Sequence, residues 1–269
     1  MAAPLRVALA GASGRMGQML VQEILAAPDL QLSGALLHAQ SRHLGEDAAA
    51  FMGRSSGVQF TADAGQALQG AEVLIDYSRV EGSLQLLPLC VQRRLPLVIG
   101  TTGFSTEQRA QLQAAGGQIP LLWAPNTSVG VNVVMNLLAQ AARQLGSAYD
   151  VEIVEAHHRH KVDAPSGTAL QMGEVIARAQ GHALAEVAVY SREGHTGARE
   201  AGRIGFATVR GGDIVGDHTV MFCGAGERIE IAHKSSSRSH YAQGALLAAR
   251  WLQSQPAGFY GMADALQLK

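Results

Sequence analysis

The sequence predicts an α/β fold with two parts: a doubly wound parallel sheet, followed by an α+β domain with an open mixed sheet. Three observations support this prediction. Short apolar runs alternate with helix-period segments up to about residue 130. A glycine-rich turn follows the first apolar run directly. Beyond residue 130, runs typical of strands follow one another without that regular alternation.

Five apolar runs in the first half have the length and composition of buried strands. They are residues 5–10, 30–37, 72–76, 97–100 and 119–123. Helical spacing separates most of them, and it is clearest over residues 18–26. Buried strands that alternate with amphipathic helices form parallel sheets covered on both faces, so a doubly wound sheet is expected.

The second half opens with a long apolar helix, predicted over residues 131–145. Strands are then predicted over residues 151–155, 186–191, 205–210, 218–223 and 228–233. The last two flank a turn that contains glycine, which indicates an antiparallel hairpin within a mixed sheet. A further helix is expected over residues 241–253, and the pattern alone does not decide which domain it joins.

Composition limits the classes of function. The 269 residues carry a formal net charge of -1, and only 16% are charged, so no global basic field exists to hold nucleic acid. No apolar run approaches the roughly 20 residues that span a bilayer. We therefore expect a cytoplasmic protein with neither nucleic-acid nor membrane partners. Cys90 and Cys223 lie in apolar runs and are expected to be buried hydrophobic residues rather than catalytic thiols.

The turn after the first predicted strand has the sequence GASGRMG, from Gly11 to Gly17. Glycines at this spacing allow backbone amides to approach a pyrophosphate, whose charge then lies at a helix N-terminus. This position, between the first strand and the first helix, is typical of a Rossmann-like dinucleotide site. A purely structural tight turn is the alternative.

The acidic residue that commonly holds the adenosine ribose, about 20 positions further on, is missing. The chain instead offers His38, Arg42 and His43 after the second strand. A carboxylate there would repel a 2′-phosphate, whereas these side chains tolerate or attract one. We therefore expect NADPH to be used at least as readily as NADH, unless these are ordinary solvated loop residues.

Two further turns lie where doubly wound sheets bind ligands. Residues 100–103, with the sequence GTTG, follow the fourth strand, and residues 124–127, with the sequence APNT, follow the fifth. Both turns are at carboxyl ends of strands, where their amides and hydroxyls could orient a nicotinamide ring. The alternative is that they are turn residues only.

Five consecutive potential cations occupy residues 157–161, within the segment EAHHRHKVDAPSGTAL. A strand is predicted before them and a helix after them, so they are expected on a strand-to-helix loop. Such a run repels itself unless anions balance it. The amides of the helix start, around Gly167 and Thr168, add a second anion-binding surface. An anionic small-molecule substrate is therefore expected.

Several motifs together closely resemble one enzyme family. They are GASGRMG, the segment IGTTGF of residues 99–104, SVGVNV of residues 128–133, and above all EAHHRHKVDAPSGTAL of residues 155–170. Residues 190–197 and 204–210 add further matches, so that nearly the whole chain is covered. The sequence resembles the 4-hydroxy-tetrahydrodipicolinate reductases, also called dihydrodipicolinate reductases.

The resemblance implies an NADPH- or NADH-dependent reduction in the diaminopimelate route to lysine, carried out in the cytoplasm by a homotetramer. It implies a dinucleotide-binding domain of residues 1–130 and 240–269, to which the final helix returns. Residues 131–239 would then form a substrate-binding and oligomerisation domain. The chemistry fits independently, because a cyclic imine dicarboxylate needs cations to bind it, a hydride donor and an acid.

The resemblance also implies roles for single residues. His157 matches the family's proton donor and acceptor, and Lys161 matches its proton donor. The substrate-binding positions match His158, Gly167 and Thr168. The cofactor contacts match Gly11, Ala12, Ser13, Gly14, Arg15, Met16, Gly100, Thr101, Thr102, Ala124, Pro125, Asn126 and Thr127. His38 stands where many members have an acidic ribose ligand, so it is a further candidate cofactor contact. No metal is expected.

Two rival functions remain open at this point. A zinc hydrolase would use His157, His158 and His160, although adjacent histidines point in different directions and no H-E-x-x-H helix accompanies them. A regulatory protein would bind NADPH without turning it over, although such a sensor needs no proton donor. The roles of Arg159 and His160 are left unassigned.

Overall fold

A computed structural model describes residues 3–268, and the chain divides into two compact units. The first unit contains the chain up to Val129 together with the chain from Ser239 onward. The second unit is Gly130–Arg238. The final helix therefore packs within the first unit, a point that the sequence pattern left open. Among the described residues, no helix combines the length and the apolar character needed to cross a membrane.

The first unit is built on a seven-stranded sheet in which every described strand pair is parallel. In sheet order the strands are β12 (Gly258–Tyr260), β6 (Pro120–Trp123), β5 (Leu97–Ile99), β4 (Val73–Asp76), β1 (Leu5–Ala10), β2 (Leu30–Leu36) and β3 (Phe60–Thr61). The central residues of β1, β4, β5 and β6 are fully buried because helices cover both faces.

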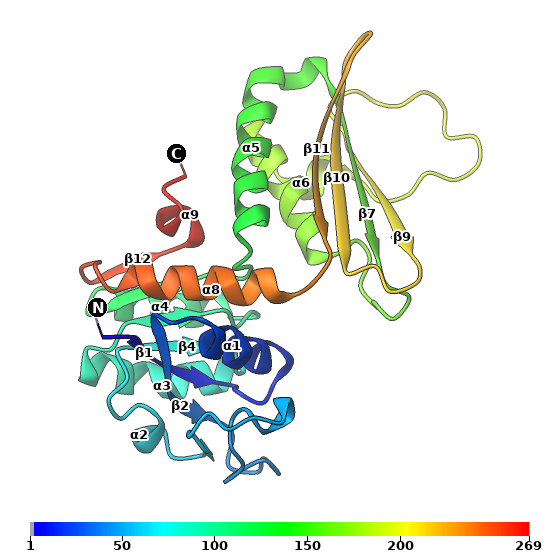
Figure 1. Cartoon of the computed structure of the whole chain (residues 1–269). Helices are drawn as coiled ribbons and strands as arrows, with labels where there is room; N and C mark the ends of the chain where they lie inside the picture. Colours follow the sequence, from blue (N-terminus) through cyan, green and yellow to red (C-terminus); the bar gives the residue numbers. More distant parts are fainter. Residues whose placement is uncertain (1–2, 269) are drawn as a thin grey trace. The chain divides into compact units, whose positions relative to one another are not determined.

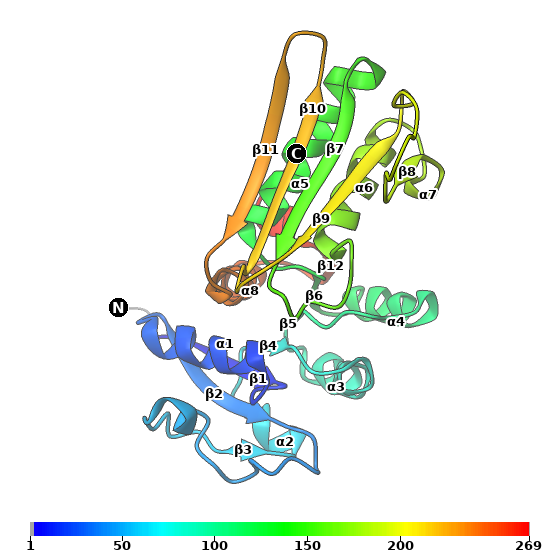
Figure 2. The same ribbon diagram turned by 90° about the vertical axis from the view of Figure 1, so that its right-hand side faces the viewer.

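Two hydrophobic clusters lie on opposite faces of this sheet. One cluster includes the helices α1 (Arg15–Ala26), α8 (Ser239–Leu252) and α9 (Met262–Ala265), as well as the flank of the short turn Ala50–Met52. The other includes α2 (Ala64–Ala67), α3 (Val80–Arg93) and α4 (Thr106–Gly116). Figures 1 and 2 show α1 and α3 on either side of the strands. The predicted doubly wound sheet is confirmed.

Two edge strands of the first unit were not predicted. β3 contains two residues and β12 contains three, and each pairs along a single edge. Segments this short carry too few residues for periodicity to register. The first helix also begins earlier than predicted, at Arg15, because Gly14 serves as its N-cap.

The second unit contains a five-stranded mixed sheet, in the order β11 (Arg228–Ser235), β10 (Gly216–Cys223), β7 (Asp150–His157), β9 (Ile204–Arg210) and β8 (Ala188–Val189). β10 is antiparallel to both of its neighbours, as the predicted hairpin requires, while β7, β9 and β8 are parallel. The prediction of an open mixed sheet is confirmed.

Helices α5 (Val129–Leu145) and α6 (Gly167–Ala179) cover one face of the second sheet (Figure 1). Strand residues alternate, and those facing the helices, such as Ile153, Val220 and Phe222, are fully buried in one cluster with α5 and α6. The opposite face, here called the outward face, carries the alternate residues, including Val154, Ala207, Thr219, Met221 and Cys223. It is covered by no helix of the described chain.

The predicted strand over residues 186–191 is wrong in most of its length. Residues 184–187 form the short helix α7 (Leu184–Val187), and only Ala188–Val189 pair as β8. The Glu186 carboxylate accepts a hydrogen bond from the Ala183 amide, which stabilises a helical first turn. A local cap thus outweighs the strand propensity of the valines and the tyrosine.

The two cysteines differ in their surroundings. Cys90 is fully buried in α3, and burial raises the pKa of its thiol to about 12. Cys223 lies on the outward face and is partly exposed, so the expectation of a buried residue is wrong there. The strand periodicity that places Phe222 in the core directs its neighbour outward.

Candidate functional site

The first unit brings four turns together at the carboxyl ends of adjacent strands β1, β4, β5 and β6. Each turn is bonded to the neighbouring strand. The Tyr77 amide donates to Ala10 (3.1 Å), the Gly100 amide to Asp76 (2.9 Å) and the Ala124 amide to Ile99 (3.0 Å). The predicted cofactor residues after β1, β5 and β6 therefore lie along one edge of the sheet.

The turn after β1 has the backbone features of an anion-binding loop. Gly11 has φ of 72°, which favours glycine. A Cβ on Gly17 would lie 2.4 Å from the Gly11 carbonyl oxygen, so this approach of helix and turn requires glycine. The N-cap Gly14 supplies no side-chain acceptor, and α1 has no acidic residue in its first turn. The first amides of α1 are thus free of side-chain caps.

The two threonine-containing turns after β5 and β6 differ in the availability of their hydroxyls. Thr127 Oγ1 donates to the Tyr241 carbonyl (2.8 Å) and accepts from the Tyr77 hydroxyl (2.7 Å), so it belongs to the scaffold. Burial raises the pKa of Tyr77 to about 12, so the phenol remains a donor. Thr101 Oγ1, in contrast, is buried and has no partner among residues 3–268. Of the Thr101 and Thr127 hydroxyls, that of Thr101 is the one available to a ligand.

The loop after β2 carries the residues expected near an adenosine ribose. His38 is exposed, directly beyond the buried Leu37. Arg42 Nε donates to His43 Nε2 (3.3 Å), and His43 Nδ1 contacts the Glu46 carboxylate (2.8 Å). The Glu46 carboxylate is therefore bound by His43 rather than by Arg42. The remaining N–H groups of the Arg42 guanidinium stay available to a ligand.

In the second unit the cationic segment begins at the end of β7. His157 is the last strand residue, and residues 158–166 form the loop to α6. Ser166 is the N-cap of α6, and its hydroxyl accepts from the Ala169 amide (3.2 Å). A Cβ on Gly167 would meet nothing within 4 Å, so the helix start at Gly167 and Thr168 has open space beside it. The predicted strand, loop and helix are all present.

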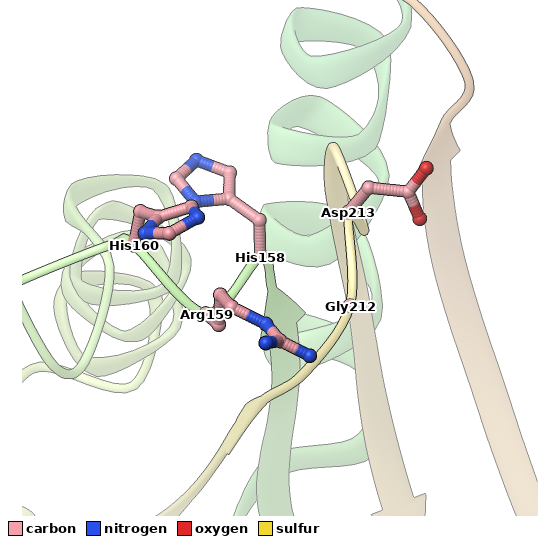
Figure 3. A pocket seen from close by; sticks show the side chains of 5 residues that line it. All are labelled: His158, Arg159, His160, Gly212 and Asp213. Atoms are coloured by element: carbon pink, nitrogen blue, oxygen red, sulfur yellow. The ribbon is translucent and has the colours of Figure 1, made fainter.

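An open cavity of about 620 Å³ lies against this loop. It is lined by His158, Arg159, His160, Gly212 and Asp213 (Figure 3). The rings of His158 and His160 lie together on one side, whereas the Arg159 side chain points toward the Gly212 loop and Asp213 points away from the histidines. The Arg159 amide also donates to the Gly212 carbonyl (3.2 Å), which joins the two loops. Neither His157 nor Lys161 lines the cavity itself.

His158 stands among other cations. Partial desolvation lowers its pKa, and the charges of Arg238, His160, His157 and Lys161 lower it further. A neutral ring is therefore favoured until an anion arrives to balance these charges. Arg238 was not singled out from the sequence, because it lies 80 positions away along the chain from His158.

Lys161 is held by a carboxylate two residues further on. Its Nζ lies 2.8 Å from Asp163 Oδ1, and its side chain is 21% exposed. The hydrogen bond from Lys161 lowers the pKa of Asp163, so this carboxyl is ionised at neutral pH. The pair fixes the ammonium group in a place that solvent still reaches.

Glu155 lies beneath the cationic loop and is 1% exposed. Its partners come from two strands and the start of α6: His157 Nδ1 (2.6 Å), the Ser166 amide (3.0 Å), Arg210 Nη1 and Nη2 (both 2.8 Å) and Thr208 Oγ1 (3.3 Å). Burial by itself raises the pKa of Glu155, but the hydrogen bonds from Arg210, His157 and Ser166 outweigh it and lower the pKa to about 2. The carboxylate is ionised in the folded protein.

His218 completes the buried group. Its ring packs edge-on against the His157 ring, with centroids 5.1 Å apart, and its Nε2 contacts the Ser166 hydroxyl (3.0 Å). Burial lowers the pKa of His218 to about 4, and the adjacent His157 adds to this effect. His218 is therefore neutral near pH 7. His157 is itself buried, with Glu155 on one side and His218 on another.

The three histidines of the rival zinc site do not converge. Among residues 3–268, no group of three or more His, Cys, Asp or Glu side chains is arranged to hold a metal ion. His157 points into the buried group, whereas His158 and His160 face the cavity.

Sequence reasoning missed several residues of this region: Tyr77, Arg210, Gly212, Asp213, His218 and Arg238. One of them left a signal. His218 lies on the same core-facing side of β10 as Val220 and Phe222, and a polar residue in such a position indicates a buried hydrogen-bond network. Arg210 reaches the site through the pairing of β9 with β7, and the others lie on loops that the fold brings there, neither of which a single sequence reveals.

The chain matches two family models over nearly its whole length. Residues 5–127 match "Dihydrodipicolinate reductase, N-terminus", and residues 130–266 match "Dihydrodipicolinate reductase, C-terminus". The chain belongs to the dihydrodipicolinate reductase family. The resemblance inferred from its motifs is confirmed.

Curated relatives agree with this membership in the dihydrodipicolinate reductase family. The chain is 58% identical over 265 residues to the 4-hydroxy-tetrahydrodipicolinate reductase of Burkholderia mallei (strain SAVP1), covering 98% of this chain and 99% of the relative. The enzyme of the same name from Burkholderia pseudomallei (strain 668) is also 58% identical, with 98% and 100% covered.

A solved structure shows the same fold. It is the dipicolinate-bound dihydrodipicolinate reductase from Paenisporosarcina sp. TG-14, with a TM-score of 0.77 and 24% identity. The alignment covers 97% of this chain and 98% of that chain. At this identity the likeness concerns the fold, and the roles of single residues are argued from the chemistry of this chain.

Proposed function

We propose that this protein catalyses the NADPH- or NADH-dependent reduction of 4-hydroxy-tetrahydrodipicolinate to tetrahydrodipicolinate, a step of diaminopimelate and lysine biosynthesis. The observation that carries the proposal is the 58% identity, over 98% of the chain, to relatives named for this reaction. The glycine turn after β1 and the cationic loop after β7 supply the two kinds of binding surface that the reaction needs.

The first unit is proposed as the dinucleotide-binding domain. The residues present fit a dinucleotide, because the uncapped amides of α1 suit a pyrophosphate and the buried Thr101 hydroxyl lacks a protein partner. The proposed contacts are Gly11, Ala12, Ser13, Gly14, Arg15, Met16, His38, Gly100, Thr101, Thr102, Ala124, Pro125, Asn126 and Thr127. When bound, the nicotinamide supplies the hydride.

The second unit is proposed as the substrate-binding domain. Its substrate is a dicarboxylate, and cations line the cavity at His158, Arg159 and His160, with Arg238 close to His158. Gly167 and Thr168 offer the open first amides of α6. One carboxylate would bind to His158 and Arg238, and the second to the helix start. A bound anion would also favour the charged form of His158.

Lys161 and His157 are proposed to handle protons. The site left electron-rich by hydride addition needs an acid, and the Lys161 ammonium group is proposed to supply that proton. Asp163 holds Nζ in place and favours its charged form. His157 is proposed as the second proton donor and acceptor, since an imidazole ring can both donate and accept a proton.

The outward face of the second sheet is proposed as the surface through which a homotetramer assembles. It presents Val154, Ala207, Thr219 and Met221 side by side in register, and the neighbouring Val209 is 48% exposed. These residues border Glu152 on the same face, which is bound by Arg192 and Arg199. An apolar patch edged by charged side chains, on a sheet face that no helix of the described chain covers, is typical of a protein–protein interface. We propose a cytoplasmic enzyme, without nucleic-acid partners, in agreement with its formal net charge of -1.

The assignment of Lys161 and His157 predicts separable effects. Absorbance at 340 nm should fall when the purified protein is mixed with NADPH and freshly generated substrate. Lys161→Ala and His157→Ala should each lower kcat about 10²-fold or more, because each removes a proton-transfer group. Nucleotide affinity should stay unchanged in both variants, since neither residue belongs to the first unit. His182→Ala is the matched control, and an inactive wild-type protein would refute the proposed reaction.

The loop after β2 predicts the choice of cofactor. We expect kcat/KM with NADPH to be at least equal to that with NADH. Arg42→Ala should lower the value for NADPH roughly 10-fold or more, because a charge-assisted hydrogen bond of about 1.5–3 kcal/mol is lost. The value for NADH should change little, and Arg54→Ala should affect neither cofactor. A large preference of the wild-type enzyme for NADH would contradict this prediction.

The proposed assembly predicts a particle four times the mass of the 28.2 kDa chain in light scattering. Val154→Asp places a charge in the centre of the outward face and should yield a smaller species, because an unpaired charge is costly to bury. Arg178→Ala, an exposed change on α6, should leave the mass unchanged. A monomeric wild-type protein would overturn the proposal.

A further inference from the structure

We propose that Glu155 is a positioning residue for His157: it fixes the ring with a proton on Nδ1 and leaves Nε2 as the atom that exchanges protons. The proposal rests on the proposed function in one respect, that His157 takes part in the reaction. The arrangement of the two side chains stands independently of the substrate.

Every partner of the Glu155 carboxylate is a hydrogen-bond donor. Oε1 accepts from the Ser166 amide, Arg210 Nη2 and Thr208 Oγ1. Oε2 accepts from Arg210 Nη1 and faces His157 Nδ1 at 2.6 Å. The backbone amide and the guanidinium cannot act as acceptors, so a proton on the Glu155 carboxyl group would find no acceptor among them. His157 Nδ1 must then carry the proton of this contact, in the neutral ring as in the charged one.

The other ring nitrogen of His157 lies beside Gly216, the first residue of β10. Nε2 has no hydrogen-bond partner within residues 3–268. A Cβ on Gly216 would lie 3.0 Å from it, so the glycine gives this edge of the ring room. Gly216 ends the loop that supplies Gly212 and Asp213 to the cavity. Nε2 is therefore the atom able to gain and release a proton, while the Nδ1 contact stays unchanged.

The position of Glu155 is itself fixed. Arg210 on β9 binds both carboxylate oxygens, and its Nη2 also donates to the Asp163 carbonyl (2.6 Å). The Ser166 amide ties the same carboxylate to the start of α6. The ring of His157 is thus oriented by a group that two strands and a helix start hold in place.

The charges around His157 act in opposite directions. Glu155 on β7 favours the imidazolium, whereas Arg210 on β9, His218 on β10, and His158 and Lys161 on the loop disfavour it when charged. Asp163 balances Lys161. Removing Glu155 or Arg210 should therefore shift the titration of His157 in opposite directions.

The first variant is Glu155→Gln. A glutamine amide cannot replace the carboxylate, because its NH2 group would face donors on whichever side it is placed. In protein with 13C-labelled histidine, the ring signal of His157 is identified by its loss in His157→Gln. Its titration midpoint should move to lower pH in Glu155→Gln, by roughly 1 unit or more. The basic limb of the kcat profile should move in the same direction.

The second variant, Arg210→Gln, keeps Glu155 beside His157 and removes the competing cation. The midpoint should move to higher pH. Glu152→Gln is the matched control: it is a carboxylate on the same strand, bound by Arg192 and Arg199, on the outward face away from His157. It should leave the midpoint and the kcat profile in place, whatever it does to stability.

Several results would overturn the proposal. A folded Glu155→Gln protein with the wild-type midpoint would do so, as would equal effects of Glu155→Gln and Glu152→Gln. If Glu155→Gln does not fold, Arg210→Gln decides, and an unchanged or lowered midpoint refutes the proposal. If the wild-type protein does not oxidise NADPH but both midpoints move as expected, the reaction is wrong and the positioning role stands.

Discussion

The Glu155 carboxylate accepts hydrogen bonds from β9, from the start of α6 and from its own strand, so it joins the parts of the second unit that carry the cationic loop. Burying an ionised group is costly, and the five contacts offset that cost only while all donors stay in place. This constraint fixes the beginning of the loop at His157 and its end at Ser166. Between these two points the cations are free to face the cavity.

The cationic loop would be unfavourable without such anchors. His158 and His160 lie side by side, with Arg238 near the first of them, so the positive charge of its neighbours disfavours a charged His158 ring. Asp163 neutralises Lys161, and Glu155 lies beneath His157. Among residues 3–268, no carboxylate forms an ion pair with His158, Arg159 or His160, although Asp213 also lines the cavity with its side chain pointing away from the histidines. A dicarboxylate substrate would supply the balancing negative charge. The first unit likewise leaves positive partial charge without an anionic side chain beside it, since its turn after β1 offers uncapped amides to a pyrophosphate.

Much of this fold could be predicted because its signals are local. The alternation of buried strands and helices, the glycine turn and the hairpin of β10 and β11 each depend on neighbouring residues. The two-residue strand β3 and the four-residue helix α7 are too short to leave such a local pattern. In the site, the residues of one segment were found, whereas Arg210, His218 and Arg238 were not. They reach the loop through strand pairing across more than fifty positions, which periodicity does not report.

Glu155 is ionised in the folded protein, and its charge stabilises the second unit. Urea unfolding of the wild-type protein and of Glu155→Gln, monitored by circular dichroism at a series of pH values, gives the free energy of unfolding of each protein. A carboxyl whose pKa is lowered from 4.5 to about 2 stabilises the fold above pH 4.5 and loses that effect as the pH falls toward 2. The difference between the two proteins should therefore be largest above pH 5 and should narrow toward pH 2. A difference that does not change with pH would contradict the account.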